Sequence, residues 1–196
     1  MRRAAISIVG IGYFVLSNPV LAHEKDLRTM TDSSGETEVA FCYRPSPNSF
    51  GLPGHAFVAF SARNPAGVRD FRAVGHTVAS GASSVSAAFS YFGGGSVSGA
   101  QMEERYTSIK QACLTVKVDR AVFQNAVSAA QPTLSKLGFP ATVASSMERY
   151  SLGSNDCITF AEKVATAIKP AGLTVPSRSS IDTPSSWINK LIASNP

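Results

Sequence analysis

Cys157 is the residue whose type and position best suit covalent catalysis. Asn155 and Asp156 precede it and are both good helix N-caps, which places the thiol in the first turn of a predicted helix over residues 157–168. Free amides and the positive end of the helix dipole favour a thiolate there, and the thiolate is the nucleophilic form of cysteine. The following apolar residues have helical spacing, so one face is expected to pack inward: Phe160, Ala161, Val164, Ala165 and Ile168.

Two histidines are candidates for the base that would act with this thiol. His55 opens a predicted strand directly after Gly54, and His76 ends the next strand directly after Gly75. Strand ends beside glycines let a side chain reach into a cleft. Thiol hydrolases use three catalytic groups: a thiol, an imidazole and a third group that orients the imidazole.

The same residues also have plainer interpretations. A single cysteine at a helix start is often buried packing or half of a disulfide, and a single histidine at a strand end is often structural. A metal site is disfavoured, because His55, His76 and Cys157 lack ligand spacing and the chain has no CxxC or HxxxH. The sequence shows no cofactor motif, since the glycines at 93–95 are not followed by the Lys-Ser/Thr of a phosphate loop.

A sheet followed by helices would position these residues. Strands are predicted over residues 37–43, 54–61, 68–78, 103–106 and 111–118, and the second and third of these form a hairpin. Helices are predicted over residues 120–130 (capped by Asp119), 157–168 and 184–193, and Pro132 and Pro140 bracket an irregular or helical piece. Strands come first, without β-α-β alternation, so the predicted fold class is α+β with a mainly antiparallel sheet.

Residues 79–100 join two of the predicted strands and are rich in serine, glycine and alanine. Phe89, Tyr91 and Phe92 interrupt this polar run. The segment is either a flexible connection or a loop that lines or covers a cleft.

The first 22 residues have the parts of a secretory signal peptide. Arg2 and Arg3 give a positive start, residues 4–16 are apolar, and Val20 and Ala22 supply small residues for cleavage after Ala22. An uncleaved anchor is the alternative, but the apolar stretch is shorter than the roughly 20 residues of a spanning helix. We therefore expect a periplasmic or secreted protein without integral membrane association. Residues 23–36, with His23, are expected to be a flexible N-terminus, and 37–196 a single domain.

Composition excludes further classes. With 44% hydrophobic and 16% charged residues, the chain is too apolar and too weakly charged to be disordered. The formal charge of +5 falls to +3 without the two leader arginines, and lysine and arginine form no patch. Nucleic acid is therefore not expected as a partner.

Export makes a disulfide plausible, because oxidising compartments preserve such bonds. The three cysteines allow one pair at most, in any of three combinations. Cys42 and Cys113 both lie in predicted strands, where a cross-strand bridge is plausible. We favour this pair, with Cys157 as the free thiol.

Two segments together resemble the circularly permuted NlpC-type papain-like superfamily, which includes lecithin:retinol acyltransferase-like proteins and permuted cysteine peptidases. The first is Gly54-His55-Ala56-Phe57-Val58, and the second runs over residues 150–160 around Asn155-Asp156-Cys157. In this group the histidine strand precedes the cysteine helix, as it does here. The resemblance covers roughly residues 37–176 and ends with Gly172-Leu173-Thr174-Val175-Pro176. Many members have asparagine directly before the cysteine, whereas here Asp156 intervenes. An acidic neighbour opposes a thiolate unless it turns away to cap the helix.

The resemblance implies a permuted papain-like fold and three catalytic residues. Cys157 would be the nucleophile, His55 the general base and His76 the residue that orients His55, with Asp70 as the alternative for this third role. The implied activity is hydrolysis of an amide or peptide bond, in a peptidoglycan-like or other peptide, through a thioester on Cys157. Two alternatives remain open. One is a non-catalytic binding or inhibitory module, which a disulfide at Cys157 would favour, and the other is a lipid-directed thiol acyltransferase.

Overall fold

The computed structural model describes residues 23–29, 36–45, 54–63, 66–78, 95–104, 112–130 and 145–196. The predicted signal peptide at 1–22, most of the connection over 79–100, and the piece between Pro132 and Pro140 lie outside these ranges. Within them, one seven-stranded sheet has the strand order β1-β6-β2-β3-β4-β5-β7. The pairing is antiparallel except between β1 and β6, which run parallel. The α+β fold class is confirmed.

Four of the seven strands and the three helices of the described ranges lie close to their predicted positions. The strands are β1 His23–Asp26, β2 Thr37–Arg44, β3 His55–Arg63, β4 Arg69–Val78, β5 Val97–Glu103, β6 Ala112–Val118 and β7 Ser145–Tyr150. The helices are α2 Arg120–Ala129, α3 Cys157–Ile168 and α4 Pro184–Ala193, with a short 3-10 turn, η2 Lys169–Ala171, after α3. The β3–β4 hairpin and all three predicted helices are confirmed.

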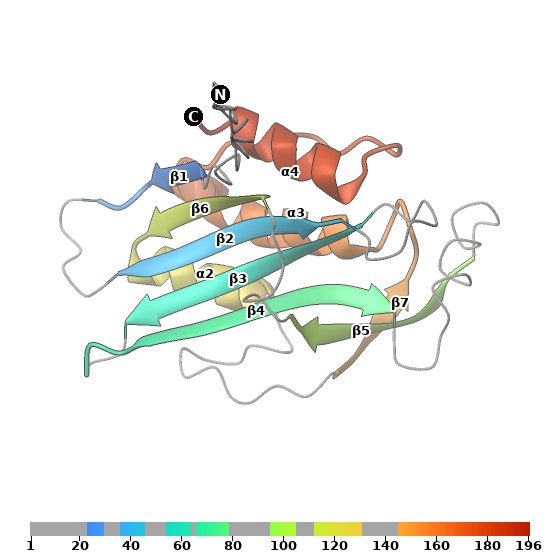
Figure 1. The fold of residues 1–196 in the computed structure, drawn as a ribbon, viewed down its shortest axis with the longest axis horizontal. Helices are drawn as coiled ribbons and strands as arrows, with labels where there is room; N and C mark the ends of the chain where they lie inside the picture. The colour runs from blue at the N-terminus through green and yellow to red at the C-terminus, as the bar shows by residue number, and fades with distance from the viewer. Residues whose placement is uncertain are drawn as a thin grey trace, which may run out of the picture.

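The three helices share one apolar core with the sheet. Helix α3 packs on β3 and β4, α2 on β2, and α4 on β2, β3 and β6; Figure 1 shows α2 and α3 together on one side of the sheet, with α4 beside them. Fully buried Phe60 from β3 meets Phe123 of α2 edge to face, with ring centroids 6.0 Å apart. Burying such a side chain contributes about 2 kcal/mol. This core fixes α3, and therefore its first residue, against the middle of the sheet.

A disulfide joins β2 to its neighbour β6. Cys42 of β2 lies directly opposite Cys113 of β6, and their sulfurs are bonded with the Cα atoms 4.1 Å apart. The predicted pairing is confirmed, and Cys157 is the free cysteine. Disulfides of this kind are typical of proteins in oxidising compartments. None of the helices in the described ranges has the length and apolar character needed to cross a membrane.

The N-terminal segment corrects one prediction. Residues 23–26 are not flexible but form β1, whose polar residues suit an exposed edge strand. Its neighbour Leu27 donates a backbone hydrogen bond to Lys117, at 2.9 Å. Asp119 is the N-cap of α2, as predicted, but its carboxylate accepts hydrogen bonds from the backbone and side chain of Thr29 rather than from the helix amides. Backbone pairing at the sheet edge orders this segment, and a hydrophobic pattern does not report such pairing.

The far edge of the sheet corrects two more predictions. Strand β5 occupies residues 97–103 and so begins within the predicted connection over 79–100, whereas the sequence predicts the strand at 103–106. Strand β7 was not predicted, and it follows α2, so the strands do not all precede the helices. Both strands are rich in small or polar residues and show no clean alternation, so their extended conformation depends on pairing with neighbours.

Candidate functional site

The thiol of Cys157 lies at the first position of α3, as predicted. Asp156 is the N-cap, and its carboxylate accepts hydrogen bonds from the backbone amides of Ile158 at 2.9 Å and Thr159 at 3.2 Å. The acidic neighbour therefore turns to the helix amides and caps α3. Cys157 itself is only 2% exposed, so its polar partners act with little screening by water.

A hydrogen-bonded turn places Cys157 next to the end of β7. After Tyr150, Ser151 and Asn155 form an isolated bridge, and the Ser151 amide donates to the Asn155 carbonyl at 2.9 Å. The Gly153 amide donates to the Asp156 carboxylate at 2.8 Å, which closes the turn on the cap. The turn thus brings the buried Tyr150 beside Cys157.

Tyr150 is a functional candidate that the sequence analysis did not single out. Burial raises the pKa of its phenol well above the ordinary value, and the nearby charges of Cys157 and Asp156, with a hydrogen bond to Cys157, raise it further. The hydroxyl therefore stays protonated at any working pH. It is a fixed hydrogen-bond donor beside the sulfur, and nothing in the local sequence distinguishes it from a packing tyrosine.

Glu104 is the group that faces His55. His55 begins β3, and its Nε2 lies 2.9 Å from Glu104 Oε1. Arg44, the register partner of His55 at the end of β2, places Nη2 3.2 Å from Glu104 Oε2. The Glu104 amide donates to the Ala73 carbonyl at 2.7 Å, which holds the residue along β4. One carboxylate, its side chain only 10% exposed, thus bridges an imidazole and a guanidinium.

Two glycines make room for this arrangement. A Cβ on Gly75 would lie 2.3 Å from His55 Nε2 and 3.1 Å from Glu104 Oε1, so a side chain at this position would displace the imidazole. Gly54, directly before His55, has φ +80° and would place a Cβ 2.5 Å from the Arg44 carbonyl oxygen. Both positions require glycine, the first for close approach and the second also for its backbone conformation.

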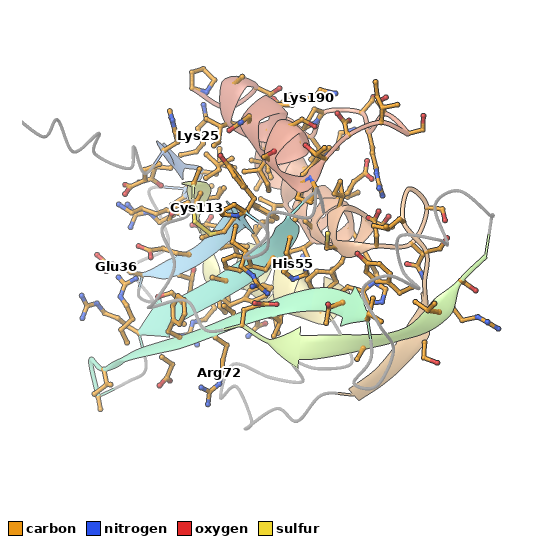
Figure 2. The ribbon with its side chains drawn as sticks, turned by 45° about the vertical axis from the view of Figure 1, so that its right-hand side comes forward. Lys25, Glu36, His55, Arg72, Cys113 and Lys190 are labelled. Atoms are coloured by element: carbon orange, nitrogen blue, oxygen red, sulfur yellow. A yellow bond between two sulfur atoms is a disulfide. The ribbon has the colours of Figure 1, made fainter. Side chains whose placement is uncertain are left out.

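The electrostatics of the site favour a protonated His55. Burial alone would lower its pKa, but hydrogen bonding and charge from Cys157, and then from Glu104, raise it from 6.5 to about 9. Burial would likewise raise the pKa of Glu104, but His55 and Arg44 together hold it below its ordinary value. His55 is therefore an imidazolium at neutral pH, paired with a carboxylate on one side and with Cys157 on the other. Figure 2 shows His55 near the centre of the molecule, with Lys25, Glu36, Arg72 and Lys190 toward its periphery.

The structure does not place the third member of the predicted set beside His55. The structure brings His55 and Cys157 together as predicted, but the group that it places against His55 is Glu104 rather than His76 or Asp70. Strand β4 approaches the imidazole at Gly75, which has no side chain to offer. His76 is buried, with its ring edge-on to that of Tyr150 at 5.2 Å.

Asp70 lies toward the other end of β4, where it pairs with Ala62 instead of the start of β3. Within the described ranges, no group of three or more His, Cys, Asp or Glu is arranged to hold a metal ion. Comparison with protein-family models, with curated proteins and with solved structures finds no match for the chain. The functional argument therefore depends on the site itself: a free thiol at a helix N-terminus, an imidazolium and a carboxylate that orients it.

Proposed function

We propose that this chain is an exported cysteine hydrolase with a permuted papain-like fold of the NlpC type, and that it cleaves an amide or peptide bond. The observation that carries the proposal is the contact chain from Cys157 through His55 to Glu104. A lone buried cysteine needs no protonated imidazole beside it, and a structural histidine needs no buried carboxylate held by an arginine. Together these residues form the working set of a thiol hydrolase.

The first chemical step is acylation of the thiol. The Cys157 thiolate attacks the substrate carbonyl carbon, and the carbonyl electron pair moves to oxygen in a tetrahedral intermediate. As that pair returns, the C–N bond breaks, and His55 gives its proton to the departing amine. The product is a thioester on Cys157, with neutral His55 still held by Glu104.

The second step is hydrolysis of the thioester. Neutral His55 takes a proton from water, and the resulting hydroxide adds to the thioester carbonyl. The C–S bond then breaks, so that carboxylic acid and thiolate are released and His55 is again protonated. In both steps the oxyanion would accept hydrogen bonds from the Tyr150 hydroxyl and from the Cys157 amide, which in the free protein donates to Tyr150.

Export and substrate class are parts of the same proposal. The predicted leader, cleaved after Ala22, would deliver the chain to the periplasm or exterior, and the Cys42–Cys113 disulfide fits such a compartment. A peptide of the cell wall, or another extracytoplasmic peptide, is the expected substrate. Because Cys42 pairs with Cys113, the disulfide at Cys157 that would favour a non-catalytic module is not present.

The test is direct detection of the acyl-enzyme. The unreduced wild-type protein and its Cys157→Ala variant are incubated with peptide amides and with soluble cell-wall peptides, and intact masses and released amines are followed. Wild type is expected to form an adduct at Cys157 and release product, whereas Cys157→Ala keeps its circular dichroism spectrum and releases none. Product release by Cys157→Ala at the wild-type rate would refute the mechanism.

A further inference from the structure

A second buried ion pair lies at the start of α3, outside the catalytic set described above. Asp156, directly before the nucleophile, has a side chain only 3% exposed, and its Oδ2 lies 2.6 Å from Arg178 Nη2. Arg178 is 11% exposed and comes from the connection between η2 and α4. Its other terminal nitrogen donates to the Thr159 hydroxyl. The guanidinium therefore bonds to both residues of the capping box, Asp156 and Thr159.

Helix capping alone does not account for this pair. An asparagine caps a helix about as well as an aspartate, so the amides of Ile158 and Thr159 do not require a full negative charge. Asp156 nevertheless buries a carboxylate one residue from the thiol, and removing one partner of a buried pair leaves an uncompensated charge. Arg178 is the cation that balances it.

Several charged or titratable groups face Cys157 from the elements around it. His55 comes from β3, with Glu104 behind it, and Tyr150 comes from β7. His76 of β4 lies against the ring of Tyr150. Within this set, Asp156 is the carboxylate adjacent to the thiol in the chain, and it opposes a thiolate wherever its own charge is not cancelled.

We propose that Arg178 is a positioning residue for the nucleophile: by pairing with Asp156 it fixes the capped first turn of α3 and cancels the charge beside Cys157. This role rests on the proposed function, because the balance of charge matters only if Cys157 reacts as a thiolate. Arg178 touches Asp156 and Thr159, and it acts on Cys157 through them.

The experiment measures the rate of iodoacetamide alkylation of Cys157 against pH in the unreduced protein, by peptide mapping. Arg178→Gln should shift the alkylation midpoint upward by about one pH unit and slow the reaction by up to about tenfold at pH values below the wild-type midpoint. Asp156→Asn, which keeps the cap, should react at least as fast as wild type. The double variant Asp156→Asn/Arg178→Gln should return to within about twofold of wild type.

A matched control removes a cation elsewhere. Arg63→Gln breaks an exposed ion pair with Glu36 at the opposite end of β3 from His55, and should leave the alkylation profile unchanged. Arg178→Lys keeps the charge and should react within about threefold of wild type, which preserves the test if the glutamine variant fails to fold. A merely structural role for Arg178 would lower thermal stability without this pattern of rescue.

The outcomes separate this inference from the proposed function. A double variant as slow as Arg178→Gln, or an Arg178→Gln profile that matches wild type, would overturn the role of Arg178. His55→Gln serves as the reference for the function itself, because the proposed mechanism requires it to slow alkylation. If His55→Gln reacts like wild type, the thiol–imidazole pair is refuted; if it slows and Arg178→Gln does not, only the inference about Arg178 is refuted.

Discussion

Glu104→Gln is the substitution that most directly tests how the site works. Glutamine keeps the size of the side chain and an oxygen for His55, but it removes the negative charge that lies 2.9 Å from Nε2. It also leaves the Arg44 guanidinium without its buried partner, so a positive charge then faces the imidazole. Both effects disfavour the imidazolium, and we expect the pKa of His55 to fall.

The size of the fall follows from the groups that raise the pKa. Burial opposes protonation of His55, while Cys157 and Glu104 together bring its pKa to about 9. An opposite charge at contact distance shifts a pKa by about one to three units, and here Cys157 remains in place. The pKa of His55 in the variant should therefore lie about one to two units lower than in wild type. Near neutral pH, a substantial fraction of the imidazole would then be unable to protonate the leaving amine.

The assay is an NMR pH titration of the imidazole, with His55 assigned through variants of the other two histidines. The alkaline limb of hydrolysis or of iodoacetate labelling gives an independent value, because the imidazolium attracts an anionic reagent. Wild type should titrate near pH 9, and Glu104→Gln clearly below it. Equal titration of the two proteins, within about 0.3 units, would refute the assignment of Glu104 as the orienting carboxylate.

Three further predictions concern packing, pH and the disulfide. Gly75→Ala should cost about a hundredfold in turnover, because the added Cβ displaces the imidazole of His55, whereas Gly95→Ala, with open space around the site of its Cβ, should not. The raised pKa of His55 contributes to the free energy of unfolding, and this contribution is fully present below pH 6.5 and is lost as pH rises through about 9. The free energy of unfolding measured in urea should therefore fall by about 3 kcal/mol over that window, and by less in His55→Gln. Replacing both Cys42 and Cys113 by alanine should cost about 4 kcal/mol in the same assay, given a sequence separation of 71, and an unchanged midpoint would contradict the bond.

Local features of the sequence predicted the positions of Cys157 and His55 and the disulfide well. A helix start is encoded by a cap, and the periodic apolar residues that follow Cys157 lie within twelve positions of it. His55 is marked by the glycine before it and by the strongly apolar strand after it. Cys42 and Cys113 each lie in a strand with a clear pattern, so their pairing needed only that the two strands be neighbours.

The contact between Glu104 and His55 could not be predicted in the same way. Glu104 is one of thirteen acidic residues, and it follows β5, a strand of mostly small and polar residues whose register is set by β4. His76 had a recognisable context, a histidine after a glycine at a strand end. Yet that glycine serves His55, which occupies the space that a side chain at position 75 would fill. The glycine at position 75 does mark a histidine site, but only the pairing of β3 with β4 shows that the histidine is His55 and not His76.

The charges around the thiol indicate what each ion pair would contribute if Cys157 reacts as a thiolate. They form two chains: Arg44–Glu104–His55 on one side and Arg178–Asp156 on the other. With His55 protonated, the first chain carries one net positive charge and the second carries none. A thiolate at Cys157 therefore brings the buried cluster to neutrality, the state that a low-dielectric site favours. Loss of the arginine in the second chain would make the same thiolate an excess negative charge, whereas loss of the carboxylate in the first chain would act on the imidazolium. The two substitutions should thus separate the titration of the nucleophile from that of the base.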